Sequence, residues 1–222
     1  MQDKPLMTSS FEAVGPAVEV NKVLKNTYML LGMTLLFSAV AAGISMALNL
    51  SPIAAIGMMI GGFICLFMVN KTADSSKGLM WIFVFAGLMG ASLGPMLNSY
   101  LQLPNGPALV MQALGGTAII FFSLSGYALV SRKDFSFMGG FLFVGLMVAV
   151  VASIANIFLG IPALNLAISG AIVLIMSGLI LFDTSRIIHG GETNYIRATI
   201  ALYLNIYNLF IHLLALLGIM DD

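Results

Sequence analysis

The residues of this chain that could carry chemistry gather near its C-terminal end. Asp183 closes a long apolar run, and Arg186 follows three residues later. Beyond a short polar stretch, a second apolar run is interrupted by Asn205, Asn208 and His212. An ionisable group surrounded by apolar sequence is costly to bury. We therefore treat these five residues as candidates for an ion path or for pH sensing.

Both parts of this set have a structural interpretation and a functional one, and the alternatives remain open. A spacing of three residues lets Arg186 pair with Asp183 on one helix face, as a plain interfacial ion pair. At roughly 100° per residue, Asn205, Asn208 and His212 fall within an arc of about 60° and form one polar face. That face either hydrogen-bonds to neighbouring helices or lines a narrow hydrated path that closes near Asp183.

Short motifs suggest three kinds of hydrolase, and the surrounding sequence argues against each. Gly90–Gly94 (GASLG) would make Ser92 a nucleophile, but the motif needs a strand-to-helix turn and lies within an apolar helical run. His189–Glu192 (HGGE) lacks the second histidine of a zinc-binding helix, and its glycines favour a turn. An aspartyl protease needs a second acid beside Asp183, which the apolar runs do not offer. We expect no enzyme activity, metal or cofactor.

Composition places the chain in a membrane. Hydrophobic residues make up 60% of it and charged residues only 8%, against about 25% charged residues in soluble domains. The net charge is zero and the basic residues are scattered, which gives no footprint for a nucleic acid. The lipid bilayer is therefore the first partner that the sequence implies.

The apolar residues form seven runs, and a helix that crosses a bilayer needs about 20 such residues. The sequence thus predicts an all-α bundle of seven transmembrane helices over residues 27–222, preceded by a polar tail at residues 1–26. Because its polar face must point inward, we expect the seventh helix to be central. The runs cover residues 27–49, 53–69, 79–101, 108–130, 137–159, 163–182 and 196–219.

The charged residues predict the orientation of the bundle. Eight of the nine basic residues fall before the first run or in every second loop, the last of which we expect to span Thr184–Tyr195, and the ninth, Arg197, lies two residues beyond that loop. The positive-inside rule then places the N-terminus in the cytoplasm and the C-terminus outside. The nine are Lys4, Lys22, Lys25, Lys71, Lys77, Arg132, Lys133, Arg186 and Arg197.

Small residues recur at four-residue spacing within two of the runs. The pairs are Gly57 with Gly61 and Gly90 with Gly94. Helix association in lipid depends on close packing, which small residues permit. We expect both pairs to mark contacts between helices of one bundle.

Several longer motifs resemble the Bax inhibitor-1 family of small seven-helix membrane proteins. They are Arg132–Phe137 (RKDFSF), Phe182–Thr184 (FDT) and Leu202–Leu204 (LYL). The segment His189–Thr199 (HGGETNYIRAT) is most similar to the bacterial YccA-like branch of that family. The resemblance covers nearly the whole chain and implies a multi-pass protein of the bacterial inner membrane.

The resemblance implies two functions. Members of the family are linked to a pH-sensitive calcium leak governed by two aspartates; Asp183 stands at the first position and Asn205 at the second. The arginine latch of those members has no counterpart in the 53–69 run. The bacterial branch modulates, and is a client of, the membrane-bound ATP-dependent protease FtsH. The missing acid favours a protein that binds and restrains FtsH, with a calcium, cation or proton leak channel as the alternative.

Overall fold

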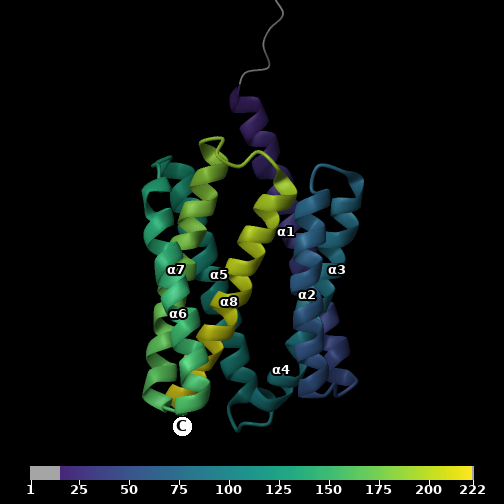
Figure 1. Cartoon of the computed structure of the whole chain (residues 1–222), viewed down its shortest axis with the longest axis vertical. Helices are drawn as coiled ribbons and strands as arrows, with labels where there is room; N and C mark the ends of the chain where they lie inside the picture. Colours follow the sequence, from purple (N-terminus) through teal and green to yellow (C-terminus); the bar gives the residue numbers. More distant parts are fainter. Residues whose placement is uncertain (1–15, 222) are drawn as a thin grey trace, which may run out of the picture.

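The computed structural model describes the backbone of residues 16–221 and is built from helices (Figure 1). Seven segments of this part of the chain are long and apolar enough to cross a membrane. The predicted all-helical architecture with seven spans is confirmed. The helices are α1 (Pro16–Ala47), α2 (Pro52–Thr72), α3 (Ser76–Ser92), α4 (Gly94–Leu101), α5 (Gly106–Ser131), the 3₁₀ turn η1 (Ser136–Met138), α6 (Gly139–Leu159), α7 (Pro162–Ile188) and α8 (Tyr195–Asp221).

Three helix boundaries differ from the prediction. Helix α1 begins at Pro16, so residues 16–26 of the expected polar tail are helical, while residues 1–15 lie outside the described part. The third span is two helices, α3 and α4, separated at Leu93. Pro95 explains this break, because it has no N–H to continue the α3 ladder. Helix α7 runs on to Ile188, which shortens the predicted loop from Thr184–Tyr195 to residues 189–194.

The helices form two groups with α8 running obliquely between them (Figure 1). One group holds α1, α2 and α3, and the other holds α5, α6 and α7. Helix α8 contacts α1 and α3 in the first group and α5 and α7 in the second. A larger share of α8 is buried than of any other spanning segment. Helix α8 therefore joins the two groups through its own side chains.

The glycine pairs behave differently. Gly90 lies against the backbone of Ser38 and Gly94 against Ser45, both on α1, with no room for a methyl group. The predicted close approach is confirmed there. It is wrong at Gly57, which has open space around it. Gly62 has the close contact on α2 instead, where an added Cβ would lie 2.8 Å from the sulfur of Met89.

Candidate functional site

The centre of the candidate site is a contact between the last turns of α7 and the middle of α8. Nδ2 of Asn205 donates a hydrogen bond of 2.7 Å to Oδ2 of Asp183. The Asn205 side chain is buried, with 5% of its surface exposed. A carboxylate inside a bundle must find a donor, because it has left water. Here an amide on the neighbouring helix supplies that donor.

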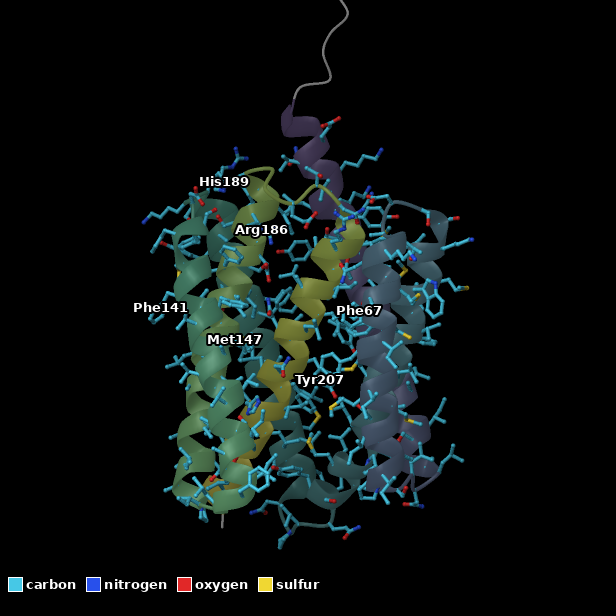
Figure 2. All side chains as sticks on the ribbon, in the orientation of Figure 1. Phe67, Phe141, Met147, Arg186, His189 and Tyr207 are labelled. Atoms are coloured by element: carbon cyan, nitrogen blue, oxygen red, sulfur yellow. The ribbon has the colours of Figure 1, made fainter. Side chains whose placement is uncertain are left out.

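Arg186 does not complete this pair. Among the ion pairs of the described residues, its partner is Glu192 at 3.8 Å, and it also donates to the carbonyl oxygen of Gly191 at 3.2 Å. The ion pair with Asp183, one of the interpretations left open by the sequence, is therefore not formed among the described residues. The reason is the short loop: the chain reverses at Gly190, where φ is +74°, and brings Glu192 back beside the end of α7. Figure 2 shows Arg186 at this end of the bundle.

The remaining polar residues of α8 are not equivalent. His212 reaches α7, where its Nδ1 lies 3.3 Å from Oγ of Ser169. Asn208 instead donates to the carbonyl oxygen of Leu204 in its own helix at 2.8 Å. Asn205 and His212 thus contact α7, whereas Asn208 is satisfied within α8. The predicted polar face is present, but only two of its three members link helices.

Two tyrosines on the opposite side of α8 were not among the candidates. The Tyr203 hydroxyl is hydrogen-bonded to the Ser38 hydroxyl of α1, and Tyr207 lies 2.9 Å from Oγ of Ser92 in α3. The two rings stack, with centroids 6.1 Å apart. Ser92, the serine of the GASLG motif, therefore contributes to helix packing. Tyrosine is typical of membrane surfaces, so two tyrosines deep in a span are the signal that could have found them.

A second group of hydrogen bonds lies at the end of the bundle where α1 begins. Asp74, in the α2–α3 loop, accepts hydrogen bonds from Arg197 at 3.0 Å and from Asn194 at 2.8 Å. Oδ1 of Asn194 also caps α8 by accepting from the N–H of Ile196 at 2.9 Å. The start of α8 is thereby fixed to the α2–α3 loop.

Hydrogen bonds from Ser136 hold the pKa of Asp134, in the neighbouring α5–α6 loop, below its usual value.

The family described as "Inhibitor of apoptosis-promoting Bax1" matches residues 20–222. The chain belongs to this Bax inhibitor family. The match takes in every spanning helix and both partners of the Asp183–Asn205 contact.

Bacterial relatives are similar over nearly their full length. A protein of Vibrio cholerae named "Uncharacterized membrane protein" is 55% identical, covering 97% of this chain and 96% of its own. The "Modulator of FtsH protease YccA" of Escherichia coli K12 is 50% identical, covering 90% and 91%. A second Escherichia coli relative, also 50% identical, is named "Inner membrane protein YccA". This Bax inhibitor family member is a multi-pass protein of the inner membrane.

The family assignment makes the composition of the α7–α8 contact informative. The aspartate pair implied by the family resemblance is here a carboxylate and an amide, at Asp183 and Asn205. Two carboxylates at this distance would share a proton, whereas an amide cannot. Within the described residues, no group of three or more His, Cys, Asp or Glu side chains could hold a metal ion.

Proposed function

We propose that this protein is a non-enzymatic modulator of an FtsH-type membrane protease, which it binds and restrains and which also degrades it. The observation that carries the proposal is the 50% identity, over nine-tenths of both chains, to the Escherichia coli protein named as a modulator of FtsH. The amide at Asn205 supports it, because it removes the second acid of the family's leak mechanism.

The proposal includes an orientation in which the N-terminus is cytoplasmic, the C-terminus is outside and α8 is the central helix. The loops at residues 73–75, 132–135 and 189–194 lie at the same end as the start of α1 (Figure 1). Those loops and the helix ends beside them hold the basic residues after Lys25, and basic loops stay in the cytoplasm. A reporter fused at the C-terminus should be active only outside. A cytoplasmic signal from that fusion would overturn the orientation.

The polar N-terminal segment is the proposed handle for degradation. An ATP-driven protease needs an accessible polar segment to grip, because a membrane-embedded bundle resists extraction. Helix α1 begins at Pro16, so residues 2–15 can be deleted without shortening it. We expect the deletion to lengthen the lifetime of the protein and to increase its inhibition of the protease. An unchanged lifetime in cells with active protease would contradict this role.

Copurification tests the proposal directly. The tagged full chain, extracted from native membranes, should retain an FtsH variant whose peptidase site is inactive and which therefore holds its clients. A tagged seven-helix protein of another family, expressed at the same level, is the control. Equal recovery of FtsH with both proteins would refute the proposal.

A calcium, cation or proton leak remains the second candidate function. It is favoured by one observation, the Asp183 carboxylate enclosed between α7 and α8. Calcium entry into liposomes that contain the purified protein distinguishes it from the first proposal.

A further inference from the structure

We propose that the seam between α1 and α5 binds one anionic phospholipid, with its phosphate at Arg132 and one acyl chain in the groove beneath. The site is separate from the Asp183–Asn205 contact and does not depend on the proposed role toward a protease.

The headgroup end of the site is a pocket of about 400 Å³ where α1, α5 and α7 come together at the basic end of the bundle. Asn21 and Leu24 of α1 form one wall, and Leu129 and Arg132 form the wall at the end of α5. His189, at the end of α7, closes the third side; Figure 2 shows His189 at this end. Basic pockets between membrane helices are typical sites for anionic headgroups.

Arg132 occupies this pocket in an unusual backbone conformation. Its φ is +50° and its ψ +24°, the left-handed region that normally favours glycine at a helix end. A side chain held there at a cost in backbone energy indicates that the side chain is needed. The ring Nε2 of His189 lies within hydrogen-bond distance of the Arg132 carbonyl oxygen, at 3.1 Å. This bond fixes the end of α5 to the end of α7.

No acidic side chain is among the described residues that line the pocket, and Arg132 gives it a positive charge. The carboxylate of Asp134 accepts a hydrogen bond from the N–H of Ser136 at 2.8 Å, within the exposed α5–α6 loop. The exposed Lys133 follows Arg132 in the chain. A planar guanidinium with five N–H donors suits the oxygens of a phosphate diester.

Deeper in the bilayer, the same two helices enclose an apolar groove of about 420 Å³. Leu31 and Gly32 line it from α1, Phe121 and Phe122 from α5, and Ile206 of α8 forms its floor. Tyr28 is the first α1 residue that lines the groove, one helical turn after Leu24 of the pocket, and its hydroxyl is hydrogen-bonded to that of Ser125 on α5. The groove continues into a further apolar cavity of about 310 Å³ that also lies against α1, α5 and α8.

The combination of pocket and groove selects the ligand. The groove lies in the hydrocarbon region, and its apolar walls offer a water molecule no hydrogen-bond partners. The pocket is at the membrane surface and carries positive charge. A molecule that fills both needs an anionic group joined to a long apolar chain, and an anionic phospholipid of the surrounding bilayer has that structure.

Native mass spectrometry of the purified full chain tests the proposal, with phosphatidylglycerol and phosphatidylcholine offered at equal concentration. We expect one tightly held phosphatidylglycerol per chain. Arg132→Gln should lower the preference about fivefold, whereas Lys77→Gln, an exposed basic residue at the same end, should not. Arg132→Gly should lower it equally without loss of thermal stability, because glycine suits the left-handed backbone.

The groove is tested separately. Gly32 has open space where a Cβ would stand, so Gly32→Leu should fill the groove without strain and displace the lipid. Gly140→Leu, at an equally open position on α6, is the matched control and should leave binding intact. Equal binding of both lipids, or no effect of Arg132→Gln and Gly32→Leu, would overturn the proposal. Competition by glycerol phosphate as effective as by the intact lipid would show a simple anion site and would also overturn it.

Discussion

The two sides of α8 bury polar groups of different chemistry. Toward α7, Asn205 donates to the carboxylate of Asp183. Toward α1, the hydroxyl of Tyr203 pairs with that of Ser38. A hydroxyl pair carries no charge at physiological pH, so it contributes packing and hydrogen bonding alone. The α7 side contains a titratable group. The buried tyrosine contacts and the titratable Asp183 therefore lie on opposite sides of one helix, so each can be altered without touching the other.

The largest expected effect is loss of stability on the tyrosine side. The Tyr203 side chain is 2% exposed and packs edge-on against Phe85, with ring centroids 5.2 Å apart. Tyr203→Ala should destabilise the bundle by about 3–5 kcal/mol, because it opens a cavity and leaves Ser38 without this partner. Tyr203→Phe should cost only about 1 kcal/mol. Thermal unfolding in detergent measures both, and equal losses would show that the hydroxyl, not the ring, is responsible.

The next effect concerns ion flux on the α7 side. Asn205→Asp would place two carboxylates at the present 2.7 Å contact, where they must share a proton. In the wild type, we expect the rate of calcium entry into proteoliposomes not to depend on pH. In this variant, we expect the rate to change about tenfold between about pH 6 and pH 8. Asn208→Asp is the control, since the Asn208 amide donates to a carbonyl oxygen of its own helix. A steep pH dependence already present in the wild type would contradict the prediction.

A smaller effect is expected when the charge alone is removed. In Asp183→Asn the side-chain oxygen can still accept from Asn205, so the contact between α7 and α8 persists. Stability should change by about 1 kcal/mol or less, and calcium flux should stay near the wild-type value. Loss of an existing flux in this variant would show that one carboxylate suffices for conduction, and the leak channel would then be the better proposal.

The smallest effect lies further along the same side. Ser169→Ala removes the hydroxyl that lies 3.3 Å from His212. Hydrogen bonds between membrane helices contribute about 0.6 kcal/mol on average, and we expect a loss of that size in unfolding measurements. Ser153→Ala, whose hydroxyl bonds to its own helix at Ala149, should cost less. The reverse order would mean that the His212 contact does not stabilise the bundle.

The spanning segments could be predicted because hydrocarbon thickness sets the length of an apolar run. Their ends could not, because a helix can continue beyond the bilayer without apolar residues, as α1 does from Pro16. The break at Leu93 could have been predicted from Pro95, which lies two residues later. The sequence does not reveal which small residues meet another helix. The four-residue spacing predicts a close contact at Gly57, whereas Gly62 makes it.

The candidate site could be predicted only to the level of a helix face. Helical periodicity places Asn205 and His212 on one side of α8, and both contact α7. Their partners depend on which helices are neighbours, which one sequence does not show. Arg186 illustrates the limit: three-residue spacing favoured Asp183, but the turn at Gly190 brings Glu192 into reach.

The distribution of charge between the two ends of the bundle has a consequence for biosynthesis. The loops at residues 48–51, 102–105 and 160–161 contain no charged residue. Each joins two consecutive spans. In the proposed orientation, the chain can therefore enter the bilayer as three helical hairpins whose tips carry no charged side chain, and each such side chain would cost about 3 kcal/mol at the membrane centre. Helix α8 follows the third hairpin in the chain, and it contacts helices of both groups. The contacts that α8 makes with both groups can therefore form only after the three hairpins have been synthesised.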